Sequence, residues 1–107
     1  WKNPTPYPVT LRYLHALRSL EAGDTSIISL DAISELSGLE ILRLAGTNIT
    51  DISVLAALGS LREIDLTGTG VRNLNPLLGL AELRLLLLVG TRTGDVKLPS
   101  TVRVLRD

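Results

Sequence analysis

The segment LEILRLAGTNITDISVLAALGS, from Leu39 to Ser60, recurs along the chain at intervals of 22 residues. The following copy, LREIDLTGTGVRNLNPLLGLAE, begins at Leu61, another begins at Leu83, and a weaker one begins at Leu17. Self-similarity at a fixed period of roughly 20–50 residues indicates a solenoid in which successive coils stack. Apolar residues keep one phase through the copies, and their first column consists of Leu17, Leu39, Leu61, Leu83 and Leu105.

Each copy combines two apolar periodicities. Around Leu42 the pattern has a period of two, which predicts a strand with Leu42 and Leu44 inward and with Arg43 and Ala45 outward. Strands of successive coils are then expected to pair in parallel. Further along the copy the apolar spacing is three, which predicts short 3₁₀ or α-helical turns. These later apolar positions are Ile49, Ile52, Leu55 and Leu58.

A Gly-Thr step follows the predicted strand in successive copies. The glycines are expected to give the backbone freedom that a tight turn needs. Buried backbone groups require hydrogen-bond partners, so we expect the threonine hydroxyls to satisfy loop groups of the neighbouring coil. The residues concerned are Gly46, Gly68 and Gly90, with Thr47, Thr69 and Thr91 after them and Thr25 in phase with these threonines.

The L-x-x-L-x-L spacing resembles that of leucine-rich repeats over nearly the whole chain. The 22-residue length, with threonine where asparagine is more common, is similar to the internalin and phosphatase-regulator type found in bacteria. This resemblance implies an α/β fold, namely a right-handed leucine-rich repeat solenoid. In such a solenoid a parallel β-sheet lines the concave side and short 3₁₀ or α segments form the convex side. The resemblance also implies a binding platform rather than a catalyst.

The register divides the chain into a lead-in and a repeat domain. Residues 1–16 are proline-rich at their start and are expected to form a lead-in and cap, because the end of a solenoid needs covering. The repeats follow as 17–38, 39–60, 61–82 and 83–104, and a further strand is expected to start within 105–107. An unpaired terminal strand can pair with another chain, which predicts edge-to-edge self-association. Since the chain opens on Trp1 and lacks methionine, we expect a processed product or, preferably, a piece of something longer.

The composition excludes several classes of function. Eleven basic and eleven acidic residues cancel, which argues against a nucleic-acid partner. The longest apolar run, Leu85 to Val89, is far shorter than the ~20 residues of a membrane helix, so no membrane insertion is expected. The absence of cysteine excludes disulfides and thiolate chemistry but leaves the compartment open, with the cytoplasm slightly preferred to secretion.

The chain offers no convincing catalytic, cofactor or metal site. His15 is the single histidine and has no cysteine or second histidine to act with, so a metal or catalytic role is improbable. Glu63 and Asp65 face the same way from one predicted strand, but charged residues are common at outward positions, so the pair does not indicate acid–base catalysis. We therefore predict no enzyme activity, no cofactor and no metal within these residues.

Function is instead expected on the outward positions of the concave sheet, which solenoids use for binding. One outward column consists of Glu21, Arg43, Asp65 and Leu87, and a second consists of Arg18, Glu40, Arg62, Arg84 and Arg106. The first three residues of each alternate in charge, so the columns could simply neutralise themselves on a solvated face. The fourth copy differs because Leu85, Leu87 and Val89 all point outward, with Ile41 further along the sheet. Apolar residues grouped in this way indicate either a contact surface or a region covered by a missing next coil, a flanking segment or a neighbouring molecule in a crystal.

Two functional hypotheses follow from this reading. The first is a non-catalytic module that binds a protein partner through its concave face. The residues expected to contact that partner are Ile41, Arg43, Arg62, Glu63, Asp65, Arg84, Leu85, Leu87 and Val89. The alternative is a regulatory or substrate-recruiting segment of a larger enzyme whose active site lies outside this chain.

Overall fold

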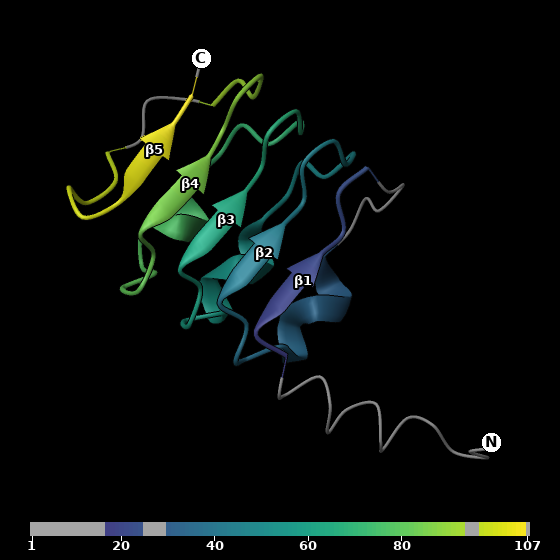
Figure 1. Ribbon diagram of the computed structural model, residues 1–107, viewed down its shortest axis with the longest axis vertical. Coiled ribbons are helices and arrows are strands. Elements are labelled where there is room, and N and C mark those ends of the chain that lie inside the picture. The colour runs from purple at the N-terminus through teal and green to yellow at the C-terminus, as the bar shows by residue number, and fades with distance from the viewer. Residues whose placement is uncertain (1–16, 25–29, 94–96, 107) are drawn as a thin grey trace, which may run out of the picture.

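A single parallel sheet runs through the computed structural model, which describes residues 17–24, 30–93 and 97–106. Its strands lie in the order in which they occur along the chain (Figure 1). This arrangement confirms the predicted stacking of coils, with one strand from each coil. The strands are β1 (Ser19–Glu21), β2 (Ile41–Arg43), β3 (Glu63–Asp65), β4 (Leu85–Leu87) and β5 (Arg103–Leu105).

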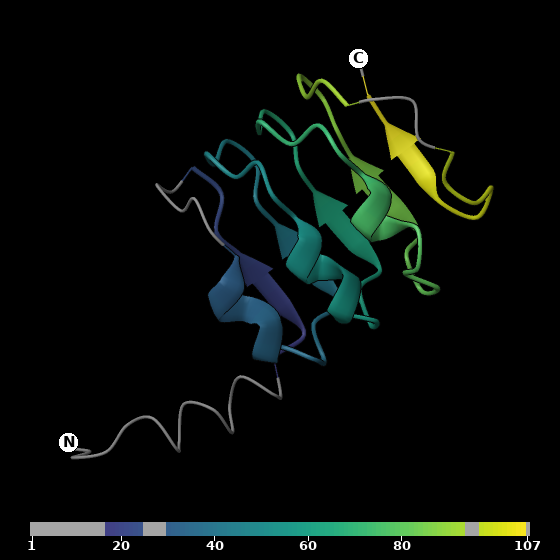
Figure 2. The ribbon, with the colours of Figure 1, turned by 180° about the vertical axis from the view of Figure 1, so that it is seen from behind.

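Short 3₁₀ helices cover one face of the sheet and leave the other face open (Figure 2). They are η1 (Asp31–Glu35), η2 (Ser53–Ala57) and η3 (Asn75–Leu77), and in the described residues they are the helical elements of the convex side. Pro76 lies in the first turn of η3, where its missing N–H would have no partner anyway. The apolar spacing of three therefore produced 3₁₀ geometry rather than α-helical turns.

The core lies between the strands and the 3₁₀ helices. Leu42, Ile64 and Leu86 occupy the middle of β2, β3 and β4, and all three are fully buried. From the convex side, Ile52, Leu55 and their equivalents pack against them in one continuous cluster. Each full burial of such a side chain stabilises the fold by roughly 1.5–3 kcal/mol. The apolar columns of the sequence thus correspond to rows of side chains that run through the stack of coils.

The turns after the strands require glycine for conformational reasons. Gly46, Gly68 and Gly90 have φ values of +73°, +71° and +71°, in the left-handed region that disfavours other residues. This confirms the role predicted for these glycines. The first coil has Asp24 in the corresponding position, with φ of +57°. Aspartate is among the few residues other than glycine that enter this region without a large penalty.

Contrary to the sequence prediction, the threonine hydroxyls do not all donate to the neighbouring coil. The Thr47 hydroxyl donates to the Leu44 carbonyl at 2.7 Å and the Thr69 hydroxyl donates to the Leu66 carbonyl at 2.8 Å, both within the same coil. Of the three described threonines in this column, Thr91 alone bonds to a neighbouring coil, and its hydroxyl donates to the Leu66 carbonyl at 2.6 Å. Thr47 and Thr69 bond within their own turn because the acceptor carbonyl lies just three residues earlier in the chain. Thr25 lies outside the described residues.

The last coil is shorter than the 22 residues that the sequence repeat predicts. Leu86 lies opposite Val104 in the β4–β5 register, a separation of 18 residues instead of 22. The final strand is therefore Arg103–Leu105, and Leu105 lies opposite Leu87 rather than in the inward column of Leu83. Among the described residues of this coil after Thr93, Leu98, Val102 and Val104 pack against the core. The division of the chain into a lead-in and a repeat domain stays a prediction, and residues 1–16 lie outside the described part.

Candidate functional site

The open face of the sheet, called here the concave face, presents two outward columns. The strand register places Ser19, Ile41, Glu63, Leu85 and Arg103 in the first column. The second column consists of Glu21, Arg43, Asp65, Leu87 and Leu105. Adjacent parallel strands are about 4.8 Å apart, so side chains in one column are immediate neighbours. Polar residues dominate the columns on β1 to β3, and leucines fill both on β4.

The charged residues of β2 and β3 interact with one another. Arg43 Nη2 lies 2.9 Å from Glu63 Oε2, an ion pair that crosses from one column to the other. Asp65 Oδ1 accepts a hydrogen bond from the backbone N–H of Thr67 at 3.0 Å. The pairing of charges within the face agrees with a self-neutralising charge pattern. The pairing runs diagonally, because Glu63 lies opposite Ile41 and Arg43 lies opposite Asp65.

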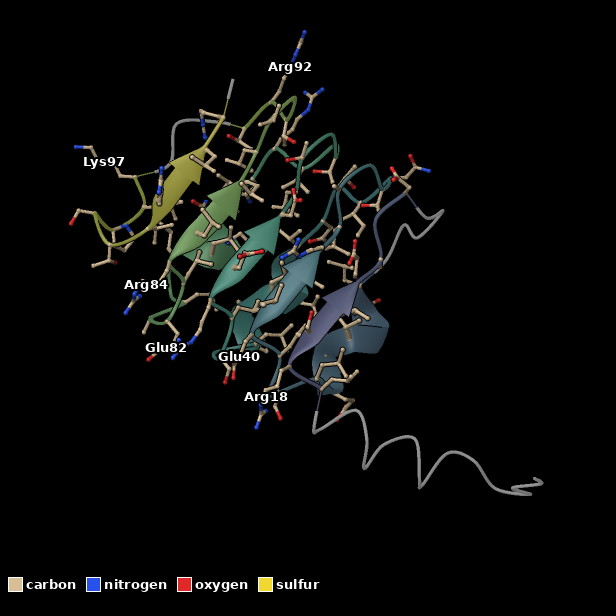
Figure 3. The ribbon with its side chains drawn as sticks, in the orientation of Figure 1. Arg18, Glu40, Glu82, Arg84, Arg92 and Lys97 are labelled. Carbon is tan, nitrogen blue, oxygen red and sulfur yellow. The ribbon has the colours of Figure 1, made fainter. Side chains whose placement is uncertain are left out.

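Four charged residues expected on the concave face lie instead at the edge where the strands begin. Figure 3 shows Arg18, Glu40 and Arg84 along this edge, each just before β1, β2 or β4. Arg62 occupies the same place before β3. Arg18 Nε lies 3.6 Å from Glu40 Oε2, and Arg84 Nη1 donates to the Ala81 and Leu83 carbonyls at 3.0 Å each.

The expected membership of Arg106 in this edge row is wrong. It relied on a spacing of 22 residues, which the shorter last coil does not keep. The Arg106 guanidinium instead donates to the Thr93 hydroxyl at 3.1 Å.

An apolar patch occupies the C-terminal part of the concave face. Leu85 and Leu87 are half-buried, whereas Val89 is 44% exposed and Leu105 is 39% exposed. We call Leu85, Leu87, Val89 and Leu105 the leucine patch. Its first three members were predicted from the sequence, and Leu105 joins them because the short last coil places it beside Leu87. Ile41 does not join the patch, because Glu63 separates it from Leu85 in the column.

The described residues carry little that would support acid–base chemistry. The carboxyl group of Asp51 has a lowered pKa because it accepts hydrogen bonds from the backbone and the side chain of Ser53. Asp51 lies just before η2, on the side away from the concave face. The part of the chain that the structure describes contains no group of three or more His, Cys, Asp or Glu side chains able to hold a metal ion. Nor does any helix there have the length and apolarity to cross a membrane.

Comparison with known proteins rests on structure rather than sequence. No protein-family model matches the chain, and a search of curated proteins gave no match. An internalin (inlF) from Listeria monocytogenes is 29% identical, with a TM-score of 0.75 over 80% of this chain and 25% of its own. Internalin C2 (inlC2) from the same species is 24% identical, with a TM-score of 0.71 over 84% of this chain and 51% of its own.

A third similar structure is the leucine-rich repeat domain of APL1B, with 15% identity and a TM-score of 0.69. It matches over 89% of this chain and 30% of its own length. The chain thus spans between a quarter and about half of the length of these three structures. Where identity is so low, the likeness shows the fold alone. The 22-residue register, the parallel sheet and these neighbours together show that the chain is a leucine-rich repeat protein whose repeats resemble those of bacterial internalins.

Proposed function

We propose that this chain binds a protein partner through its concave face, with the leucine patch as the centre of the contact. The observation that carries the proposal is the change in the outward columns at β4. Positions that hold Glu63 and Asp65 on β3 hold Leu85 and Leu87 on β4. A solvated face has no need for this change, and grouped outward apolar side chains favour contact with another surface.

The surroundings of the leucine patch suit a protein surface. Carboxylates of β3 border it on one side, and Arg103 lies beside Leu85 on the other. An apolar centre within a polar rim is the usual anatomy of a protein interface. Glu63 already pairs with Arg43, so these two residues are expected to fix the orientation of the partner more than its affinity. Ile41, Arg62 and Arg84 would lie at the periphery of this contact.

The fold supports the proposal by analogy. Solenoids offer extended open surfaces that are used for binding, and the similar structures share this architecture. Within the described residues, no feature favours the alternative of a substrate-recruiting segment in a larger enzyme. Self-association through the edge strands β1 and β5 stays a prediction.

The proposal can be tested by photo-crosslinking in an extract of the organism that encodes the chain. A photoreactive amino acid at Leu87 is expected to capture a protein that mass spectrometry can identify. The same residue at Leu78 is the matched control, because Leu78 is 45% exposed and follows η3 on the convex side. Affinity of the purified partner is then measured for the Leu85→Glu/Leu87→Glu and Leu78→Glu variants, after circular dichroism has shown that both fold.

Loss of binding only in the Leu85→Glu/Leu87→Glu variant would support the concave face as the contact surface. Removing a central apolar anchor typically lowers the binding free energy by about 2 kcal/mol or more, which is roughly a thirtyfold change in affinity. Equal affinity of both folded variants, or equal crosslinking from both positions, would refute the proposal.

A further inference from the structure

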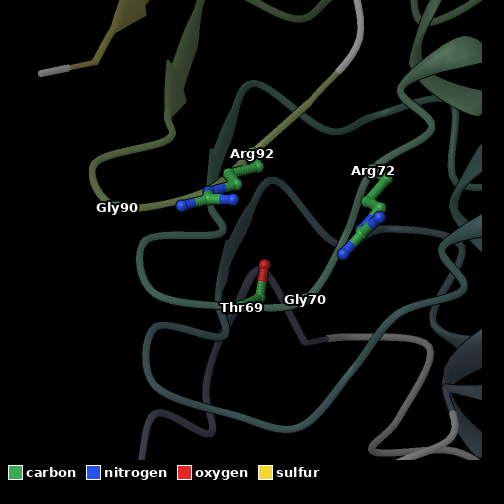
Figure 4. A pocket seen from close by; sticks show the side chains of 5 residues that line it. All are labelled: Thr69, Gly70, Arg72, Gly90 and Arg92. Atoms are coloured by element: carbon green, nitrogen blue, oxygen red, sulfur yellow. The ribbon is translucent and has the colours of Figure 1, made fainter.

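A small polar hollow lies at the turns that follow the strands, and its lining residues are distinct from those of the leucine patch. It encloses about 200 Å³ and is lined by Thr69, Gly70, Arg72, Gly90 and Arg92. Figure 4 shows the guanidinium groups of Arg72 and Arg92 on either side of the hollow, with the Thr69 hydroxyl between them below. Two positively charged groups thus share one small space at this edge of the solenoid.

The repeat register explains why the two arginines lie in adjacent coils. Arg92 is the equivalent of Gly70 one coil later, and Arg72 is the equivalent of Thr50. A Cβ atom on Gly70 would lie 3.0 Å from the Thr50 methyl group, so a side chain at that position points toward its neighbour in the preceding coil. One coil later the Arg92 side chain extends toward Gly90 and the Arg72 side chain extends toward Gly70, so both guanidiniums border the hollow (Figure 4). Gly70 itself lacks a side chain, which leaves the floor of the hollow open.

The polar hydrogens at the floor of the hollow already donate to backbone carbonyls. The Thr69 hydroxyl donates to the Leu66 carbonyl at 2.8 Å, and the Gly70 N–H donates to the Ile49 carbonyl at 3.2 Å. Neither Arg72 nor Arg92 takes part in the ion pairs or side-chain hydrogen bonds of the described residues. The groups that remain to bind a ligand are therefore the N–H donors of two guanidiniums.

We propose that this hollow binds a phosphate group, either as inorganic phosphate or as a phosphate monoester. The described residues that line the hollow include no carboxylate to balance the two guanidiniums, and a doubly charged anion between them would offset their mutual repulsion. The planar fork of arginine also matches the oxygens of a phosphate, to which it can donate two parallel hydrogen bonds. The site is separate from the leucine patch and does not depend on the proposed protein partner.

The test is a titration of the isotope-labelled chain with inorganic phosphate, followed by NMR at constant ionic strength. The amide signals of Thr69, Gly70 and Gly90 are expected to shift and to saturate. Arg72→Gln and Arg92→Gln should each weaken the affinity roughly tenfold, because a hydrogen bond between charged groups contributes about 1.5–3 kcal/mol and each 1.4 kcal/mol is a factor of ten. Arg18→Gln is the matched control, since it removes the same charge before β1 and should leave the affinity for phosphate unchanged.

Two further arms decide the meaning of the result. Phosphoserine in place of phosphate distinguishes the two sources, because tighter binding would point to a monoester and equal binding to the phosphate group alone. Sodium chloride added to the same ionic strength tests for general anion binding. The proposal is overturned if phosphate causes no saturable shift, if chloride produces the same shifts, or if the Arg72→Gln/Arg92→Gln double variant binds phosphate as well as the unmodified chain.

Discussion

At the scale of single residues, inward and outward neighbours on one strand have opposite consequences for stability. Leu44 and Leu66 are fully buried, whereas the Arg43 side chain between Leu42 and Leu44 is 46% exposed. We expect Leu44→Asp or Leu66→Asp to abolish folding, because a buried carboxylate without a partner costs several kcal/mol and a domain is stable by only about 5–15 kcal/mol. Far-ultraviolet circular dichroism and thermal melting would measure the effect.

Arg43→Ala is the matched control for those substitutions. It removes the ion pair with Glu63, and exposed pairs contribute about 0–1 kcal/mol. The melting temperature is therefore expected to change by a few degrees at most. Similar melting curves for Arg43→Ala and Leu44→Asp would contradict the assignment of inward and outward positions.

The glycines of the strand-to-turn step allow a second prediction at this scale. Gly68 has φ of +71°, and a Cβ atom there would meet no heavy atom closer than 3.8 Å. Gly68→Ala is thus expected to destabilise the fold by about 1–2 kcal/mol through backbone strain alone. Gly59 has no atom within 4 Å of an added Cβ and lies outside the left-handed region, so Gly59→Ala should be neutral or slightly stabilising. Urea titration of both variants would test the difference, and an equal loss of stability would exclude strain as the cause.

At the scale of elements, a side-chain hydrogen bond begins each of the two central convex segments. Asp51 Oδ1 accepts from the Ser53 N–H at 2.9 Å before η2, and Asn73 Oδ1 accepts from the Asn75 N–H at 2.9 Å before η3. The two acceptors are 22 residues apart and occupy equivalent places. Such turns let a short polar side chain replace a backbone acceptor at the start of a helical segment. The apolar periodicity does not predict this column, because its members are polar.

Because Asn73 fills the place of Asp51 one coil later, Asp51→Asn should keep the turn and change the pH dependence of stability. Hydrogen bonds from Ser53 lower the pKa of Asp51 below its ordinary value of 3.8. A lowered pKa in the folded state adds stability above the ordinary value, and that stability is lost as the pH falls through the lowered pKa. Asp51→Asn keeps the acceptor oxygen without the charge. Between about pH 5 and about pH 2, thermal melts should therefore show a smaller drop for Asp51→Asn than for the unmodified chain. Identical pH profiles for the two proteins would rule out this role of Asp51.

At the scale of the whole molecule, β5 covers the C-terminal end of the described sheet. The Arg103 N–H donates to the Arg84 carbonyl and the Leu88 N–H donates to the Leu105 carbonyl, both at 2.8 Å. Val102 and Val104 pack against the core from this last coil. A coil in a solenoid depends on its neighbours, so the end coil protects the apolar edge of the one before it.

Removal of this cover should therefore be measurable. A chain that ends at residue 93 would expose Leu86 and Leu88 and leave the β4 edge unpaired. We expect a lower melting temperature, because each 1 kcal/mol of lost stability lowers it by about 4–8 °C in a domain of 60–100 residues. Open strand edges also pair between chains, so light scattering should show self-association. A monomer with an unchanged melting temperature would show that β5 contributes nothing to the fold.

The sequence by itself determined the repeat, the inward and outward positions and the turn glycines. It could do so because a 22-residue period places the same side chain in the same slot of each coil, where packing or backbone geometry admits few alternatives. Three of the four members of the leucine patch followed from the same register. The sequence did not predict the ion pair of Arg43 with Glu63, nor the positions of Arg62 and Arg84 at the sheet edge. The sequence period does not fix the partners of exposed side chains.

Only the tertiary structure decided where the irregular last coil rejoins the sheet. Pairing at a separation of 18 residues moves Leu105 from an inward column to the outward column beside Leu87. This register is the one in which Val102 and Val104 pack against the core and β5 forms backbone hydrogen bonds with β4. The spacing of the sequence repeat does not contain that information. That Arg72 and Arg92 line one hollow likewise depends on the distance between coils, and the sequence period does not give that distance.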